Sequence, residues 1–290
     1  GSVHRILKSN EMGREVRFVK KRAGWKWSAL VTVVVALIVS PLYFIAIGGF
    51  MSTEEIFYKP PYLFPPEPTL QYYREAFFTL FPYIKNSFIL SFGTLLLTLI
   101  VALPASFVVT KFEFSMKSSL SFLFAFVQMI PYTAVIIPLF LMFTKMKLIN
   151  SHFGAVLALS VFLVPFAIII LRSYMASVPS GLIDAALIDG AGYFKIFTNI
   201  FLPLSAPGIA SVSILVFLLA WGNFIVPLAF IKEESMRPIS IGLYVFIGQY
   251  GVEWNKLMAG SMIYTIPPLI VALLAGRAIV AGLTAGAFKE

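Results

Sequence analysis

The sequence predicts an all-α polytopic membrane protein with six transmembrane helices, several of them kinked. Its 290 residues are 59% hydrophobic and only 12% charged, whereas about a quarter of the residues in soluble domains are charged. Six stretches lack Asp, Glu, Lys and Arg, and each reaches the length of about 20 apolar residues that a membrane-spanning helix needs. These stretches are 27–53, 86–110, 118–144, 148–171, 196–231 and 257–276.

Within these stretches, proline positions and lengths locate the spans. The run 196–231 is long enough to contain an approach segment that ends near Pro203 and Pro207. The run 238–252 is too short to span, so we expect a loop or interfacial piece there. The expected spans are about 27–50, 86–110, 118–144, 152–173, 208–231 and 258–280. Prolines inside them predict kinks, which membrane bundles tolerate when neighbours satisfy the freed carbonyls; they are Pro104, Pro131, Pro138, Pro165, Pro227, Pro267 and Pro268.

The distribution of basic residues predicts the orientation. With six spans and an inner N-terminus, most of the 22 Lys and Arg fall on the inner side, many of them in the basic tail 1–26. The positive-inside rule therefore places both termini in the cytoplasm. The first apolar stretch exceeds the 7–15 residues of a signal-peptide core, so we expect it to remain as a span. The excess of basic residues in the inner segments also explains the net charge of +9, so no nucleic-acid partner is needed to account for it.

Two segments outside the spans are long enough to fold. The outer segment 51–84 is rich in Pro, Tyr and Phe and predicts a cap at the outer interface, where aromatic residues are favoured. The inner segment 178–204 predicts a short helix over 182–189 with Ser180 as N-cap, Asp184 in about the first turn and Gly190 and Gly192 at its end. An amphipathic piece follows, with Phe194, Phe197, Ile200 and Phe201 on one side.

No motif of enzymatic chemistry is present. The chain has no Cys and only two His, and no metal-ligand pattern surrounds either His. It lacks the phosphate-binding G-x-x-x-x-G-K-[ST] loop, H-E-x-x-H and G-x-S-x-G. We therefore expect a protein that is not an enzyme and binds no cofactor of its own. If transport is driven by ATP, the ATP and Mg²⁺ bind to another polypeptide.

Polar side chains inside the spans are candidates for a solute path. Ion-coupled carriers usually embed carboxylates or histidines near the membrane midplane, and these spans lack Asp and Glu. Amides and aromatic rings suit neutral, hydroxyl-rich solutes, although such residues also form interhelical hydrogen bonds. A self-sufficient secondary transporter or channel for small polar solutes remains the alternative. The path candidates are Gln128, Tyr132, Trp221 and Asn223, with His152 at the outer interface.

The inner helix carries a recognisable motif. The run D-A-A-x-x-D-G-A followed by I-x-L-P resembles the EAA loop of ABC-importer permeases, with Asp where that family usually has Glu. Further stretches resemble the carbohydrate branch of that family, of the maltose-G type: FPPEPTLQYYREAF, the Asn86-Ser87 pair and EWNKLMAGSMIYTIPP. The motif residues here are Asp184, Ala185, Ala186, Asp189, Gly190, Ala191, Ile200, Leu202 and Pro203.

This resemblance implies a function and a set of partners. The inner helix would dock into a cleft on a cytoplasmic ATPase and couple its closure to alternating access of a sugar path. A second, related permease would complete the path, two ATPase subunits would bind inside, and a solute-binding protein would deliver the sugar outside, near 51–84 and 232–257. The expected location is the bacterial inner membrane, in contact with lipid. Composition alone leaves open that 182–191 is merely an interfacial helix.

Overall fold

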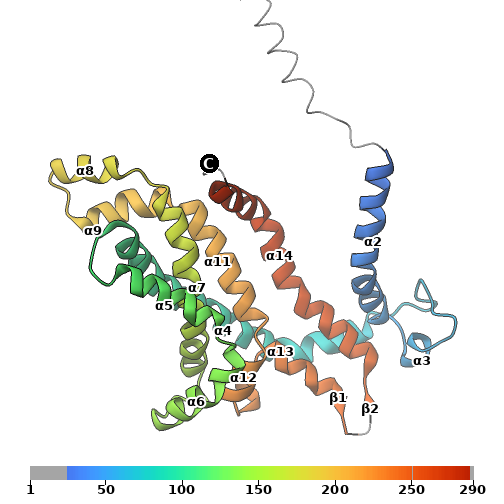
Figure 1. The fold of residues 1–290 in the computed structure, drawn as a ribbon. Helices are drawn as coiled ribbons and strands as arrows, with labels where there is room; N and C mark the ends of the chain where they lie inside the picture. Colours follow the sequence, from blue (N-terminus) through green and yellow to red (C-terminus); the bar gives the residue numbers. More distant parts are fainter. Residues whose placement is uncertain (1–24, 250, 288–290) are drawn as a thin grey trace, which may run out of the picture.

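The computed structural model describes residues 25–249 and 251–287. In this part of the chain, helices dominate, and the strands form a single short hairpin in which Ile247 pairs with Val252 (Figure 1). Residues 1–24 of the expected basic tail 1–26 lie outside the described residues. The α-helices are α2 (Trp25–Gly48), α3 (Thr53–Ile56), α4 (Gln71–Lys111), α5 (Lys117–Met129), α6 (Tyr132–Lys145), α7 (His152–Ala176), α8 (Ser180–Ile188), α9 (Tyr193–Ile196), α10 (Leu202–Leu204), α11 (Ala206–Trp221), α12 (Ile225–Phe230), α13 (Ile239–Gly242) and α14 (Trp254–Ala287). The remaining elements are the π-helix η1 (Phe197–Phe201), the 3₁₀ turns η2 (Glu234–Met236) and η3 (Leu243–Phe246), and the strands β1 (Ile247–Gly248) and β2 (Gly251–Val252).

Four described helices are long and apolar enough to cross a membrane by themselves: α2, α4, α7 and α14. Two further pairs of helices pass the same test only when taken together, and each pair is sharply bent. If each bent pair makes one crossing, the number of crossings among the described residues is six, the number that the apolar stretches predict.

Helix α4 begins earlier than the sequence suggested. Its 41 residues start at Gln71, so residues 71–84, which we expected in the outer cap, extend the second span. The remaining outer segment contains α3, whose start is closed by reciprocal hydrogen bonds between Ser52 and Glu55. The hydroxyl of Tyr73 donates to the Ala46 carbonyl oxygen at 2.7 Å and ties α4 to the end of α2.

The third expected span, 118–144, is two helices rather than one kinked helix. Helices α5 and α6 meet at an angle of 101°. The break falls at Ile130 and Pro131, where Ile130 is extended, with ψ of 122°. A residue before proline is pushed out of the helical region, and proline cannot donate to the helical ladder. The sequence rules located the break but did not predict its size.

The fifth expected span, 208–231, is also interrupted. The segment Tyr193–Leu204 meets α11 at 76°, with the buried Ser205 at the bend, two residues beyond Pro203. Helix α11 then ends at Trp221, and a three-residue break separates it from α12. The break lies inside what the sequence presented as one continuous span, and the half-buried Asn223 accepts from the Val226 amide at 3.0 Å, at the start of α12.

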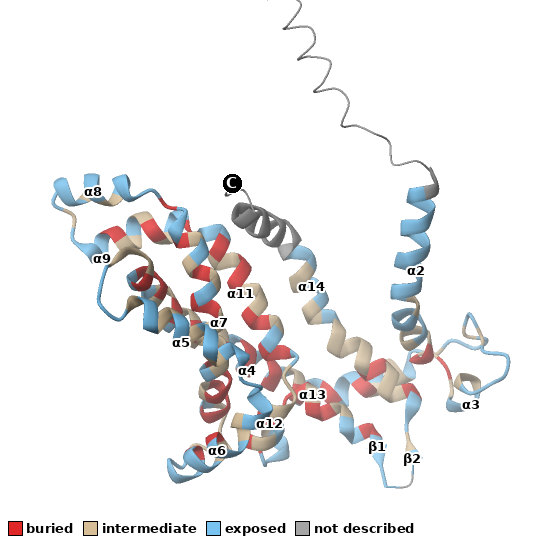
Figure 2. Ribbon diagram, in the orientation of Figure 1, coloured by how far each residue is buried: buried red, intermediate tan, exposed pale blue. Residues whose placement is uncertain are grey.

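Helix α4 lies at the centre of the bundle and packs most extensively on α7 and α11. Small residues allow this close approach: a methyl group added at Gly93 would lie 2.9 Å from the Val156 side chain. Helix α2 stands apart from the bundle (Figure 1) and its described side chains are largely exposed (Figure 2). It reaches the rest of the chain mainly through α14, where Gly48 abuts Met258.

Candidate functional site

Helix α8 ends in a Schellman motif built around Gly190. The amide of Gly190 donates to the Leu187 carbonyl oxygen at 3.0 Å, and the amide of Ala191 donates to that of Ala186 at 2.9 Å. Gly190 has a φ of +79°, the left-handed conformation that such a cap requires and that glycine adopts without a steric cost. Gly190 therefore ends the helix as the sequence predicted.

The two faces of α8 differ in their environment. Ile183, Ala186 and Ala191 are partly buried against a core cluster. Asp184, Ala185, Asp189 and Gly190 are exposed, and so are the large side chains of Leu182, Leu187 and Ile188. Figure 2 shows α8 as a mostly exposed helix at the edge of the bundle. The motif thus divides into residues that attach the helix to its own chain and residues that face outward.

The start of α8 departs from the prediction in two details. Pro179 occupies the N-cap position and Ser180 is the first helical residue, with no side-chain cap hydrogen bond. The first turn contains no acidic residue, because the helix starts two residues earlier than expected and Asp184 falls in the second turn. Its carboxylate therefore lies farther from the helix N-terminus than the prediction required.

A cluster of buried side chains fixes α8 to the ends of two long helices. It contains Phe107 of α4, Met175 at the end of α7, Val178, Ile196 and Phe201. Phe107 and Phe201 are in edge-to-face contact, with ring centroids 4.7 Å apart. The Lys111 ammonium donates to the Val178 carbonyl oxygen at 2.7 Å and lies 5.1 Å from the centre of the Phe201 ring. We call these residues with Lys111 the anchor cluster.

In the piece that follows α8, three of the four apolar side chains expected on one side, Phe197, Ile200 and Phe201, pack in the cluster; the expectation for Phe194 is wrong. Ile196 is fully buried, whereas Phe194 is 80% exposed. Both residues lie in α9, ahead of the π-helix η1. Leu202 is half-buried and Pro203 is exposed, in the short α10 just before the 76° bend.

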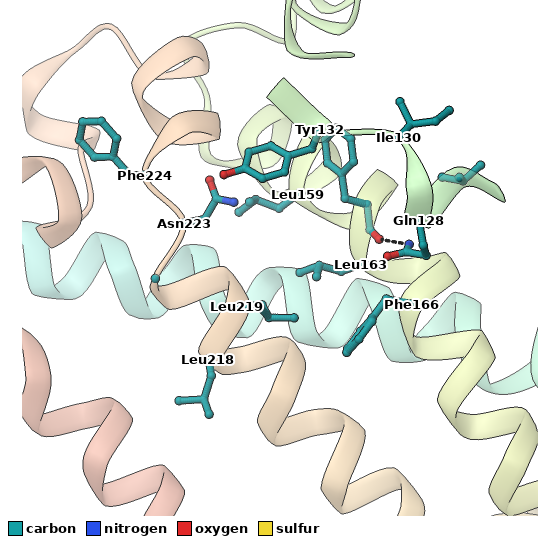
Figure 3. A pocket seen from close by; sticks show the side chains of 13 residues that line it. Gln128, Ile130, Tyr132, Leu159, Leu163, Phe166, Leu218, Leu219, Asn223 and Phe224 are labelled. Atoms are coloured by element: carbon teal, nitrogen blue, oxygen red, sulfur yellow. Dashed lines mark hydrogen bonds between the residues drawn. The ribbon is translucent and has the colours of Figure 1, made fainter. Parts of the chain in front are cut away.

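Three of the four path candidates come together around one hollow of about 450 Å³ between α5, α7 and the end of α11. Gln128, Tyr132 and Asn223 line it, together with Phe162, Phe166 and Leu219. In Figure 3 the Tyr132 ring and Asn223 extend into the same space from opposite sides. The Gln128 amide donates to the Phe162 carbonyl oxygen at 3.0 Å (Figure 3).

The fourth candidate does not reach the hollow. Trp221 is 2% exposed and lies in the core between α4, α11 and α14. Its indole N–H donates to the Tyr264 carbonyl oxygen at 3.2 Å, and its ring stacks on Phe217 and Tyr264. The helical phase of α11 turns it away from Asn223, so the expectation of a path residue at Trp221 is not supported. His152, at the start of α7, does not line the hollow either.

Within the described residues, no group of three or more His, Cys, Asp and Glu is placed to hold a metal ion. The arrangement of the hollow suits solute contact: two amides, one phenol and several aromatic and aliphatic side chains. Such a lining hydrogen-bonds hydroxyl groups and stacks on the apolar faces of sugar rings.

Comparison with known proteins identifies the family. Residues 102–285 match the model of the family described as binding-protein-dependent transport system inner membrane component. The chain belongs to this family. As members do, it is a membrane permease of ABC-type import systems, and its apolar helices lie in the inner membrane.

Its relatives include named sugar permeases. The chain is 30% identical to the diacetylchitobiose uptake system permease DasC of Streptomyces coelicolor, over 92% of this chain and 98% of that protein. It is 32% identical to the glucose import permease GlcU of Saccharolobus solfataricus, over 94% and 97%. It is 36% identical to the trehalose/maltose permease MalG of Thermococcus litoralis, over 71% and 75%.

A solved structure supports the fold. The chain superposes on a chain of a bacterial ABC transporter involved in import of the acidic polysaccharide alginate, with a TM-score of 0.78. The match covers 88% of this chain and 95% of that chain at 19% identity. At this identity the similarity concerns the fold of the permease.

Sequence reasoning missed two basic side chains that contact other parts of the bundle. Lys111 and Arg172 follow directly after apolar stretches, and the sequence predicted no contact for either. The structure places Lys111 in the anchor cluster and turns Arg172 toward Ser121 of α5. The only available signal was that each lies within a turn or so of a span end, where long side chains can fold back.

Proposed function

We propose that this permease is one half of the translocation path of an ATP-driven importer of sugars or oligosaccharides. A second permease of the same family forms the other half. Two ATPase subunits bind the inner face and carry ATP and Mg²⁺, and a solute-binding protein delivers the sugar at the outer face. Both termini lie in the cytoplasm, and the residues from about 27 onward form the permease domain.

The observation that carries this proposal is the two-sided character of α8. Its inner residues are fixed to α4 and α7 through the anchor cluster, while its outer face presents small and apolar side chains with two carboxylates. Exposed apolar side chains beside carboxylates fit a protein cleft that contains arginine or lysine. We assign the ATPase contact to the exposed Asp184, Ala185, Asp189 and Gly190. Ala186 and Ala191 attach the docked segment to the anchor cluster, and Leu202 and Pro203 join it to span 5.

The same connections provide a route for coupling. When ATP draws the ATPases together, α8 moves with them, and the anchor cluster transmits that movement to the ends of α4 and α7. Span 5 follows through η1 and α10, because Phe201 belongs both to η1 and to the cluster. Packed interfaces have discrete arrangements, so a displacement of α8 would favour another arrangement of the bundle and expose the path on the outer side.

The hollow at Gln128, Tyr132 and Asn223 supports a neutral or hydroxyl-rich solute. Its polar groups lie at breaks in the helices, next to Pro131 and in the 222–224 segment. Irregular backbone at membrane depth is tolerated where it lines a cavity. The sugar names of the relatives agree with this lining.

Co-purification with the ATPase tests the proposal. The chain is co-expressed with its ATPase and partner permease, and the wild type is compared with Asp184→Lys and Ala185→Trp. Both positions are exposed, so neither change disturbs the interior of this chain. Retention of the ATPase by the wild type and its loss by the variants supports docking through α8. Equal retention by all three contradicts it.

A further inference from the structure

A second hollow is lined by the same two helices as the first, α5 and α7, although the two hollows share no lining residue. It measures about 500 Å³ and is lined by Ser121, Phe124, Ala125, Ile168, Ile169, Arg172, Ser173 and Ala176. A third, of about 370 Å³, shares Ser121 and Arg172 with it and includes Lys117, Ser118 and Glu113. The three hollows therefore follow one pair of helices from Asn223 to the 113–118 connection.

Helical spacing places the first two hollows on the same faces. Ser121, Ala125 and Gln128 recur at four- and three-residue intervals on α5, and Phe162, Phe166, Ile169 and Ser173 do so on α7. Ser121 and Gln128 are seven residues apart, about 10 Å along the helix. A solute leaving the first hollow along this groove would next meet Ser121 and Arg172.

Arg172 is the polar centre of the second hollow. Its guanidinium donates to the Ser121 hydroxyl oxygen at 2.8 Å across the two helices, and the residue is half-buried. Among the residues that the structure describes, no Asp or Glu forms an ion pair with it. Arginine offers five N–H donors in a planar fork that matches carboxylate, phosphate or sulfonate oxygens. Most of that capacity remains available to a ligand.

Arg172, Lys117 and Glu113 together give the second and third hollows a net charge of about +1. Lys117 forms an ion pair with Glu113 at 2.7 Å, so these two neighbours largely offset each other. Glu113 is the carboxylate that would oppose an anion here, and its side chain is 87% exposed, where solvent screens it. The half-buried guanidinium is screened less, so it dominates the potential in the second hollow.

We propose that Arg172 and Ser121 form an anion-binding site on the inner half of the path, specific for a saccharide that carries a negatively charged group. This proposal rests on the proposed importer function and narrows the class of sugar that is transported. The sugar ring passes the neutral hollow at Gln128, Tyr132 and Asn223. The carboxylate, phosphate or sulfonate of the sugar then binds the Arg172 guanidinium. The Ser121 hydroxyl oxygen, which accepts a hydrogen bond from Arg172, fixes the guanidinium in the hollow that Ser173 also lines.

The absence of cysteine from the sequence allows a direct test. A single cysteine is introduced as Ser173→Cys in the complex that has been shown to retain its ATPase, in phosphatidylcholine nanodiscs. Its labelling rates with an anionic sulfonate thiol reagent and a cationic ammonium reagent are compared. We expect the anionic reagent to be favoured, and Arg172→Gln to lower the ratio roughly three- to ten-fold, as one unit charge at such short range implies. Arg172→Lys should keep most of the ratio, and the ratio at the distant control Thr144→Cys should be insensitive to Arg172.

Protection by added sugars identifies the ligand. Trigalacturonate should slow labelling of Ser173→Cys in the presence of Arg172 and fail to do so in Arg172→Gln, whereas maltotriose should protect in neither. An unchanged ratio in Arg172→Gln, or equal protection by both sugars, overturns the proposal. Protection by phosphatidylglycerol in the nanodisc without protection by trigalacturonate overturns it in favour of a lipid headgroup site. Lack of labelling by either reagent shows that the partner permease covers the hollow, which also overturns it. Because only complexes that retain the ATPase are used, none of these outcomes bears on the importer function.

Discussion

The amide of Ala191 donates to the carbonyl oxygen of Ala186 at 2.9 Å, and both side chains pack on the anchor cluster. The hydrogen bond closes the end of α8, and the packing of the two alanines holds that end against α4 and α7. The small residues of the motif have separate physical reasons. Ala186 and Ala191 fit against the cluster, Gly190 supplies the left-handed turn, and nothing within the chain restricts the size of a side chain at Gly181 or Gly192.

The Schellman motif predicts different effects for two substitutions of Gly190. Gly190→Val should destabilise the end of α8 by about 1–2 kcal/mol, because a β-branched residue is strained at positive φ. Gly190→Asn should cost less, since Asn tolerates this conformation. ATPase activity stimulated by cargo-loaded binding protein measures the effect. If Val and Asn have equal activity, the left-handed cap does not support coupling.

The outward face of α8 predicts that size matters at positions where the chain itself leaves room. A side chain added at Gly181 would meet nothing within 4 Å, so Gly181→Trp should leave the isolated permease intact. In the assembled transporter we expect loss of the ATPase on size-exclusion chromatography. Thr133→Trp, an equally exposed position on α6, is the matched control. Retention of the ATPase by Gly181→Trp would show that this end of α8 is not covered.

The anchor cluster predicts uncoupling when its centre is removed. Phe201 is fully buried, and Phe201→Ala should cost about 3–5 kcal/mol by the general cost of such cavities. Phe201→Leu, which keeps much of the volume, should cost less. We expect the ATPase to remain bound while its stimulation by cargo falls, because the docking face of α8 is unchanged. The measurement compares three quantities in the variant: ATPase binding, stimulated ATPase rate and uptake rate. If both rates fall only in proportion to the loss of ATPase binding, the prediction of uncoupling is wrong.

The position of the first hollow predicts that substitutions at Gln128 and Trp221 have different effects, one on transport and the other on stability. Gln128→Leu should lower the uptake rate with little effect on thermal stability, since Gln128 is exposed to the hollow. Trp221→Leu should lower the melting temperature, because the substitution empties a buried site and removes the hydrogen bond to Tyr264. Uptake by reconstituted vesicles and the melting temperature of the complex separate the two. The reverse pattern would place the path at Trp221 after all.

The connection between α12 and α13 is held to α4 by side-chain hydrogen bonds. The Asn86 amide donates to the carbonyl oxygens of Ser235 and Arg237, at 2.8 and 3.0 Å, and the Ser87 hydroxyl accepts from the Ile239 amide at 2.8 Å. Asn86→Leu should leave two carbonyls without their donor at a cost of about 1–3 kcal/mol. We expect faster trypsin cleavage after Lys232 than in the wild type, while Lys85→Leu, the exposed neighbour of Asn86, serves as the control. Equal cleavage rates would show that Asn86 does not restrain this connection.

The sequence by itself determined the features that depend on composition and short-range chemistry. Six uncharged stretches predict membrane helices because hydrocarbon cannot solvate charges or open backbone. Pro131 predicts a break because proline lacks an amide hydrogen. Gly190 predicts the end of α8 because it can adopt a positive φ. The family motif over 184–203 was equally readable, because its residues lie close together in the sequence.

Only the tertiary structure decided which distant residues meet. Pro131 predicts a break but not the 101° angle between α5 and α6; α5 packs on α7, whereas α6 packs on α12 and α7. Trp221 and Asn223 are two residues apart, yet one is in the core and the other lines the hollow, because helix phase and the end of α11 together set their directions. Ser121 and Arg172 are 51 residues apart, and no local rule pairs them. Such pairings depend on how whole helices pack, and that packing is summed over many weak contacts that no short window of sequence contains.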